Sequence, residues 1–217
     1  MRDEAVKSAV ALVAQPAATV TLIRDAPRGL EVLMLRRSLS LAFMPGVHVF
    51  PGGALDAGDD SPESQALCVG LDDSAASRAL GIERGGLAYW IAAIREAFEE
   101  AGILLAYDAG GGIVSLSEAT ADRYRAHRQA LDEGRGDFAA FTLGEGLRLA
   151  VDRLRYFGHW ITPVGAPRRY DTRFFIALAP EYQEARHDNR ETIAHVWVRP
   201  QEALELCARE AINMRFP

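Results

Sequence analysis

The sequence predicts an α/β protein in which strands and helices alternate along one continuous pattern. Three observations lead to this prediction. Short apolar runs of strand length recur along the chain, amphipathic stretches of helix length lie between them, and glycine or proline marks most of the boundaries. The 217 residues contain no linker, repeat or low-complexity tract. We therefore expect a single domain over residues 1–217.

The first elements in chain order are expected to be strands. Residues 18–23 and 30–35 predict a hairpin, because a turn with Pro27 and Gly29 separates them. Residues 46–50 predict another short strand, which ends at a proline and two glycines. The polar stretch that follows predicts a loop-rich segment with a short helix around 64–69 or 74–80.

The clearest helix is Leu87–Ala101, followed by Gly102 at the position where glycine commonly ends a helix. The remaining elements are expected to be strands at 103–107, 156–162, 173–179 and 194–198, and helices at 117–131, 146–154 and 200–209. We expect His48, His159 and His195 to occupy strand positions, and Trp90, Trp160 and Trp197 to lie in the core.

Composition and charge exclude several classes of protein. The net charge of −6 argues against nucleic acid or an anionic membrane as a partner, since both require a basic face. No apolar run approaches the roughly 18 residues that a membrane span requires. The N-terminal residues make a poor signal peptide, and two cysteines are too few for a disulfide framework. These features predict a cytoplasmic protein with a small-molecule partner.

The helix Leu87–Ala101 carries an unusual acidic face. At about 100° per residue, its apolar residues share one arc, whereas Glu96, Glu99 and Glu100 share the opposite arc, with Arg95 at its edge. Neighbouring carboxylates repel one another, and the helix dipole disfavours negative charge at this end. An ordinary solvated face is one interpretation. A cation bound by these hard oxygen ligands, Mg²⁺ or Mn²⁺, explains both penalties more simply.

The wider sequence pattern resembles the Nudix box. Residues 95–103 read REAFEEAGI and are similar to its second half, REUxEExGU, in which U is an aliphatic residue. The run Phe50-Pro51-Gly52-Gly53 supplies the glycines of its first half, G-x5-E. There are two departures: Asp59 stands where the box has glutamate, and 35 residues separate Asp59 from Arg95. The long spacer indicates an insertion over residues 60–86 inside the motif.

A Nudix branch that includes the peroxisomal coenzyme A diphosphatases carries such an insertion. Residues 43–53 (FMPGVHVFPGG) and 167–175 (PRRYDTRFF) are similar to segments of that branch. The resemblance implies a Nudix-type α/β/α sandwich, with a mixed sheet flanked by helices. It also implies a core over about 17–206 and a further helical insertion over about 115–155.

The resemblance further implies a hydrolase that cleaves a diphosphate linkage in a nucleoside diphosphate derivative, with Mg²⁺ or Mn²⁺ as cofactor. The implied metal ligands are Glu96, Glu99 and Glu100, together with the backbone carbonyl of Gly53. Glu191, which precedes the last strand, is a candidate extra ligand, although a solvated loop residue is an equal reading. The catalytic base is expected to be Glu96 or a glutamate outside the box. Arg95 would orient a box glutamate, and a surface ion pair is the alternative.

Substrate recognition is less defined by the sequence. Arg168, Arg169 and Arg173 are candidates for binding substrate phosphates. The resemblance favours coenzyme A or an acyl-coenzyme A. However, coenzyme A-specific relatives of another branch have arginine where this chain has Ala42, so NADH and ADP-ribose stay open. We expect the lobe 60–86 to select the group beyond the diphosphate, the alternatives being a solubility feature or a homodimer contact.

Two other interpretations of the acidic helix compete with the hydrolase. The first is a non-catalytic Nudix module that binds a nucleotide for regulation, which the replacement at Asp59 favours and the three retained glutamates disfavour. The second is an acidic metal-binding helix in an unrelated fold, which leaves the FPGG run unexplained.

Overall fold

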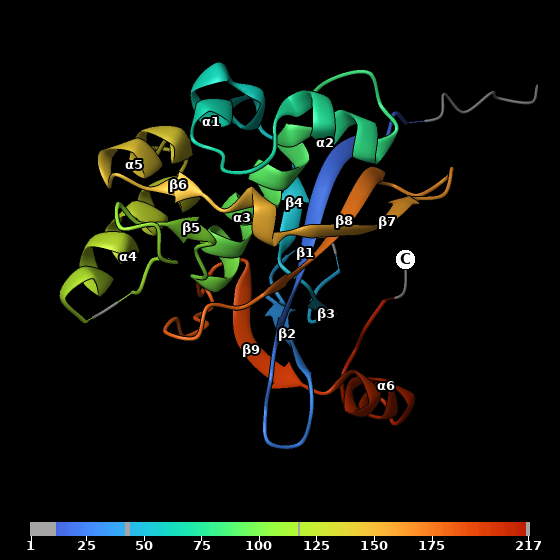
Figure 1. The fold of residues 1–217 in the computed structure, drawn as a ribbon. Helices are drawn as coiled ribbons and strands as arrows, with labels where there is room; N and C mark the ends of the chain where they lie inside the picture. Colours follow the sequence, from blue (N-terminus) through green and yellow to red (C-terminus); the bar gives the residue numbers. More distant parts are fainter. Residues whose placement is uncertain (1–11, 42–43, 117, 216–217) are drawn as a thin grey trace, which may run out of the picture.

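A computed structural model describes residues 12–41, 44–116 and 118–215 of the chain, and its centre is the helix α3 (Leu87–Ala101). The sheet lies on one side of α3, and two further helices with a small second sheet lie on the other (Figure 1). None of the described helices is long and apolar enough to cross a membrane.

The main sheet has seven strands in the order β3-β2-β1-β8-β7, with β4 also pairing with β1 and β9 with β2. The β1–β8 pair is parallel and the other pairs are antiparallel, so the sheet is mixed, as the resemblance implied. Six of its seven strands were predicted, with ends that differ from the observed ones by at most three residues, whereas β4 was not predicted. The strands are β1 (Gln15–Arg24), β2 (Glu31–Arg37), β3 (His48–Val49), β4 (Gly52–Ala54), β7 (Arg155–Ile161), β8 (Tyr170–Leu178) and β9 (Thr192–Val198).

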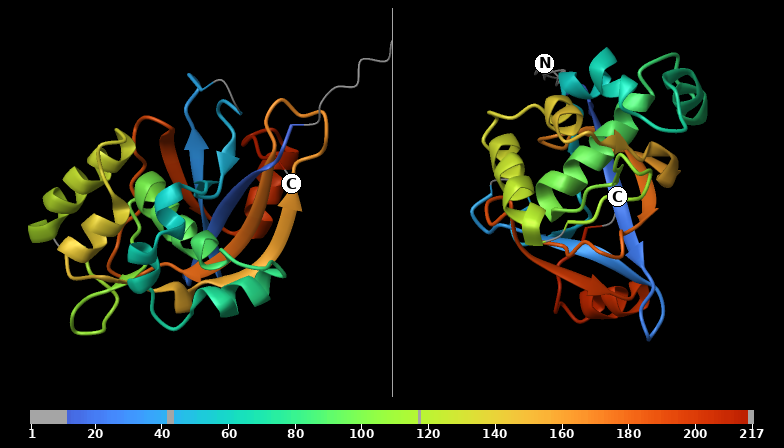
Figure 2. Two further views of the ribbon diagram at one scale, coloured as in Figure 1. Left: turned by 90° about the horizontal axis from the view of Figure 1, so that it is seen from above. Right: turned by 60° about the vertical axis from the view of Figure 1, so that its left-hand side comes forward.

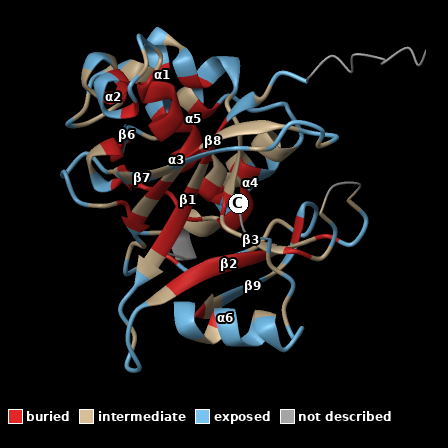
Figure 3. Cartoon of the chain, turned by 90° about the vertical axis from the view of Figure 1, so that its right-hand side faces the viewer, coloured by how far each residue is buried: buried red, intermediate tan, exposed pale blue. Residues whose placement is uncertain are grey.

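The helix α3 lies where its sequence pattern predicts, and it fills the core. Ile91 and Ile94 are fully buried and Phe98 is 1% exposed, in the cluster that includes the inner faces of β1 and β2. The Phe98 ring stacks on Phe141, with 5.1 Å between the ring centroids. On the opposite face of the sheet, α6 (Pro200–Ala208) covers the part formed by β2 and β9, where Ala203 packs (Figures 2 and 3).

The insertion at 60–86 follows a short 3-10 helix, η1 (Ala57–Asp60), and forms both of the helices considered for it, α1 (Pro62–Ala66) and α2 (Asp73–Leu80). It is packed against the core, because Leu67, Ala76 and Leu80 belong to the main buried cluster. The Asp73 carboxylate accepts the N–H groups of Gly85 and Leu87 at 3.1 and 3.0 Å, which fixes the lobe to the start of α3.

The region after α3 corrects one prediction. The expected helix at 117–131 is present as α4 (Glu118–Asp132), but 146–154 is not helical. That segment forms β6 (Arg148–Leu149) and a 3-10 turn, η2 (Val151–Arg153), because Leu149 pairs with β5 (Ala106–Tyr107) and hydrogen-bonds to Leu67 of the lobe. The second helix is α5 (Phe138–Gly144), whose N-terminus is capped by the Asp137 carboxylate.

Two further expectations have mixed outcomes. The predicted strand at 103–107 pairs only at β5, and the buried segment before it is held by Gln183, whose amide group hydrogen-bonds both the N–H and the carbonyl of Leu104. The three histidines lie on strands, as expected. Trp90 is buried and Trp197 is half-buried, but Trp160 is 49% exposed on the edge strand β7, so its core assignment was wrong.

Candidate active site

The strand β4 and the helix α3 bring the two halves of the motif together. A Cβ atom on Gly53 would lie 2.5 Å from Oε1 of Glu96, so any larger residue at this position would displace the carboxylate. The neighbouring Gly52 donates its N–H to Oε2 of Glu100 at 3.0 Å. The FPGG run and the acidic helix therefore form one site, although the insertion separates them in sequence.

Arg95 is the organising cation of this site and is 5% exposed. Its Nε and Nη2 atoms each donate to one oxygen of Asp59 at 3.0 Å, and Nη2 also donates to the carbonyl of Ala54. Its Nη1 donates to Glu96 at 2.9 Å and to Glu99 at 3.4 Å. The guanidinium thus joins the η1 turn to two glutamates of α3, which matches the orienting geometry expected of Arg95.

Asp59, which departs from the motif, forms a buried ion pair with Arg95. It is 2% exposed, and its Oδ2 also accepts the N–H of Asp56 at 2.8 Å. Because the η1 turn brings the backbone close to Arg95, the shorter aspartate reaches the guanidinium with both oxygens. The replacement therefore gives no support to a degraded, non-catalytic site.

Burial raises the pKa values of the three glutamates on the acidic face. Desolvation raises the pKa of Glu96 to about 7 despite the opposing charge of Arg95, and it raises the pKa of Glu99 to about 7 in the same way. The pKa of Glu100 is raised well above its ordinary value, first by burial and then by the charge of Glu96. Burial thus disfavours the charged forms of all three glutamates. A bound cation would favour the charged forms.

The last carbonyls of α3 receive donors from distant parts of the chain. Nε of Arg128, on α4, donates to the carbonyl of Glu99 at 2.6 Å. The Arg186 N–H donates to the carbonyl of Ala101 at 2.7 Å. The sequence after α3 offers no basic residue in the next turn, so no local signal could have revealed Arg128. Its contact depends on how α4 folds back over the end of α3.

Further carboxylates surround this end of the helix. Glu191, in the loop before β9, is exposed, and its charge contributes to the raised pKa of Glu100 and of Asp132. Burial is the main cause that raises the pKa of Asp132, at the end of α4, to about 6. Asp188 instead accepts two backbone N–H groups of its own loop. The structure thus places the charge of Glu191 within electrostatic range of Glu100, and it adds Asp132, which sequence reasoning missed.

The donor set fits a hard divalent cation, because it consists of carboxylate oxygens and a backbone carbonyl beside a glycine. Within the described residues, however, no three acidic, histidine or cysteine side chains converge on a common point. The reason lies in their present partners: Arg95 holds Glu96 and Glu99, while the Gly52 N–H holds Glu100. A cation would bind by turning these carboxylates toward one centre.

The three candidate phosphate-binding arginines do not lie together. Ala18 on β1 pairs with Arg173 of β8 on one side and with Gly53 of β4 on the other. The backbone of Arg173 therefore lies two strands, or about 10 Å, from that of Gly53. Its guanidinium is buried over the ring of Tyr89, 5.8 Å from the centroid. Arg168 and Arg169 precede β8, and Arg169 donates to the backbone carbonyls of Thr162 and Leu12.

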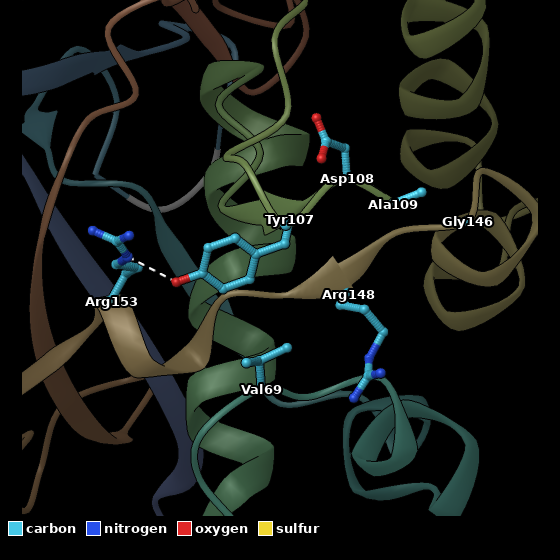
Figure 4. Close-up of a pocket in the computed structure, with 8 residues that line it drawn as sticks. Val69, Tyr107, Asp108, Ala109, Gly146, Arg148 and Arg153 are labelled. Atoms are coloured by element: carbon cyan, nitrogen blue, oxygen red, sulfur yellow. Dashed lines mark hydrogen bonds between the residues drawn. The ribbon is translucent and has the colours of Figure 1, made fainter.

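A shallow depression of about 440 Å³ lies outside this site, beside β5 and β6 (Figure 4). It is lined by Arg148 and by Arg153, whose Nε donates to the hydroxyl of Tyr107 at 2.8 Å. Arg148 is engaged with the backbone carbonyls of Leu67 and Cys68. None of the box glutamates lines this depression, so it is not the cleft that the motif predicts.

Comparisons with known proteins agree with this geometry. Residues 71–217 match the family described as the NUDT19 Nudix domain. The chain is 33% identical over 225 residues to the acyl-coenzyme A diphosphatase NUDT19 of Gallus gallus, covering 88% of this chain and 60% of the relative. It is 30% identical to the human protein of the same name, covering 82% and 55%. The chain thus spans little more than half the length of these relatives.

A solved structure supports the same conclusion for the fold. The NUDIX hydrolase from Alicyclobacillus acidocaldarius superposes with a TM-score of 0.76 at 28% identity, covering 94% of this chain and 87% of that one. The family match covers well over half of the chain and includes the whole acidic helix. The chain therefore belongs to the Nudix family, in the group defined by the NUDT19 Nudix domain.

Proposed function

We propose that this protein is a divalent-metal-dependent hydrolase that cleaves the diphosphate linkage of coenzyme A or an acyl-coenzyme A. The observation that carries the proposal is the buried acidic site, in which Glu96 lies against Gly53 and Arg95 holds Glu96 and Glu99. The names of the relatives from Gallus gallus and Homo sapiens, both acyl-coenzyme A diphosphatases, support this substrate class.

The cation would be held by Glu96, Glu99, Glu100, the carbonyl of Gly53 and, as an outer contribution, Glu191. When bound, Mg²⁺ or Mn²⁺ supplies charge neutralisation for the diphosphate oxygens and lowers the pKa of a water molecule. Arg95 keeps two of the carboxylates oriented, since its guanidinium is fixed from behind by Asp59. An Oε atom of Glu96 or of Glu191 accepts the proton of the attacking water.

Substrate binding is proposed to extend from this site toward Arg173. Its Nε is buried, has no hydrogen-bond partner among the described residues and lies 3.9 Å from a carboxylate oxygen of Asp171, so a substrate phosphate would have to compete with this ion pair. Arg168 and Arg169 lie in the loop before β8 and would reach only the distal part of a long substrate. Ala42 lies outside the described residues. The experiment below distinguishes coenzyme A from NADH and ADP-ribose as the substrate.

The test is a substrate panel with product identification. Purified protein is incubated with coenzyme A, acetyl-coenzyme A, NADH and ADP-ribose in Mg²⁺, Mn²⁺ or EDTA, and the products are identified by mass spectrometry. Metal-dependent cleavage of coenzyme A to phosphopantetheine and a nucleoside bisphosphate is expected, with Glu99→Gln as the inactive control. Tight binding of one nucleotide without cleavage in any metal would support the non-catalytic module instead.

A further inference from the structure

The helix α4, in the insertion after α3, contacts the end of the acidic helix through Arg128. This side chain is 9% exposed, and its Nε donates to the carbonyl of Glu99 at 2.6 Å. Its Nη1 lies beside Gly102, where a Cβ atom would come within 3.1 Å of it. Gly102 has φ +69°, so the turn that ends α3 is shaped to receive the guanidinium.

The end of α3 concentrates negative charge that the helix's own Arg95, paired with Glu96 and Glu99, offsets only in part. Glu96, Glu99 and Glu100 lie in its last two turns, where the helix dipole already disfavours negative charge, and its last turn contains no basic residue. Arg128 approaches this end from another element, with Asp132 and Asp188 as its other close charges. A buried guanidinium at a helix C-terminus offsets both the dipole and the carboxylates.

The burial of Arg128 indicates that its positive charge matters as well as its shape. Burial disfavours its charged form, and its Nη2 atom is buried with no hydrogen-bond partner among the described residues. Such a group is costly to bury. A neutral donor could satisfy one carbonyl at lower cost, so the retained guanidinium points to a need for positive charge here.

We propose that Arg128 is a positioning residue for the acidic site, which caps α3 and supplies the counter-charge that keeps Glu99 and Glu100 in place before a cation binds. This inference rests on the proposed function in one respect, that these glutamates bind a divalent cation. Arg128 and the cation would then act on the same carboxylates. Each should partly compensate for the loss of the other.

The experiment compares three variants with a control from the same helix. Arg128→Met removes charge and donor, Arg128→Gln keeps a neutral donor, and Arg128→Lys keeps the charge. The control is Arg125→Met, because Arg125 is exposed and, among the described residues, pairs only with Asp122 of its own helix. Thermal unfolding is measured in EDTA and in saturating Mn²⁺, together with amide hydrogen exchange at residues 99–102.

In EDTA, Arg128→Met should lower the Tm by about 4–8 °C, from an unsatisfied carbonyl and an uncompensated charge. In Mn²⁺ the loss should be about half as large, because the cation replaces the missing positive charge. Exchange at residues 99–102 should accelerate about tenfold in EDTA. Arg128→Lys should restore most of the stability and Arg128→Gln little of it, while Arg125→Met should match the wild type.

An equal loss of Tm in EDTA and in Mn²⁺ would overturn the proposal, since it would show a mechanical brace with no electrostatic link to the cation. Equal behaviour of the Gln and Lys variants would overturn it as well. If Arg128→Met does not fold, the comparison of Gln with Lys decides. If Mn²⁺ leaves the wild-type Tm unchanged, the proposed metal site fails, and the EDTA exchange rates of the three variants still test whether Arg128 holds α3 by its charge.

Discussion

Replacing Asp59 with asparagine tests the ion pair on which the geometry of the acidic site depends. The change removes one negative charge and preserves the side-chain shape. In the native structure both Asp59 oxygens accept from Arg95 at 3.0 Å, and the side chains of Asp59 and Arg95 are 2% and 6% exposed. Asparagine would present an NH₂ group to one of the two guanidinium donors, so one hydrogen bond would be replaced by a donor–donor contact.

The size of the effect follows from burial. Breaking a buried ion pair from one side typically costs about 3–5 kcal/mol. Arg95 keeps Glu96, Glu99 and the carbonyl of Ala54 as partners, so the lower end, about 3 kcal/mol, is expected. For a chain of this size, that loss corresponds to a fall in Tm of about 6–12 °C. The freed guanidinium would also compete with a cation for the glutamates, weakening Mn²⁺ binding by about tenfold or more.

The assay is urea unfolding followed by tryptophan fluorescence, to which buried Trp90 contributes, with the Mn²⁺ dissociation constant measured by calorimetry. The matched control is Asp60→Asn, because Asp60 is the neighbouring aspartate, is exposed, and accepts from Gln65 only at the surface. A second variant, Asp59→Glu, restores the residue of the usual motif. It should cost about 1–3 kcal/mol, since another methylene group at a residue that is 2% exposed must displace its neighbours.

Two outcomes would refute this reasoning. If Asp59→Asn changes the free energy of unfolding by less than about 0.5 kcal/mol, the buried pair contributes no more than a surface contact. If the protein is destabilised but binds Mn²⁺ as the wild type does, Asp59 supports the fold without acting on the glutamates.

Two further predictions concern the carboxylates themselves. Glu99→Gln and Glu100→Gln should each lower turnover by about 100-fold. The metal-free Tm should stay the same or rise, because repulsion between the neighbouring carboxylates is relieved. Unchanged kcat in both variants would contradict the proposed site. The second concerns pH: folding raises the pKa of Glu96 and Glu99 from 4.5 to about 7, so the folded state binds more protons than the unfolded state between these values. The metal-free Tm should therefore fall as pH rises from about 5 to 8, and Mn²⁺ should reduce this fall. A Tm that rises over this interval in EDTA would refute the raised pKa values of Glu96 and Glu99.

Much of the fold could be predicted from local pattern, because some elements are determined by their own residues. The bounds of α3 follow from its apolar period and the glycine after it, and the strands of the main sheet follow from apolar runs between turns. The error at 146–154 arose because its apolar residues recur at helical spacing. The segment is extended because the neighbouring lobe and β5 offer it backbone partners, which no local pattern reveals.

The sequence by itself determined the acidic face of α3, the glycine pair and the Nudix motif, since these depend on residue identity and spacing. Only the tertiary structure decided that Gly53 lies against Glu96, that Asp59 reaches Arg95 across the insertion, and that Arg128 caps α3. These contacts join residues at least 29 positions apart in sequence. Their geometry is set by how the sheet and the two insertions pack around one helix, and periodicity carries no information about that packing.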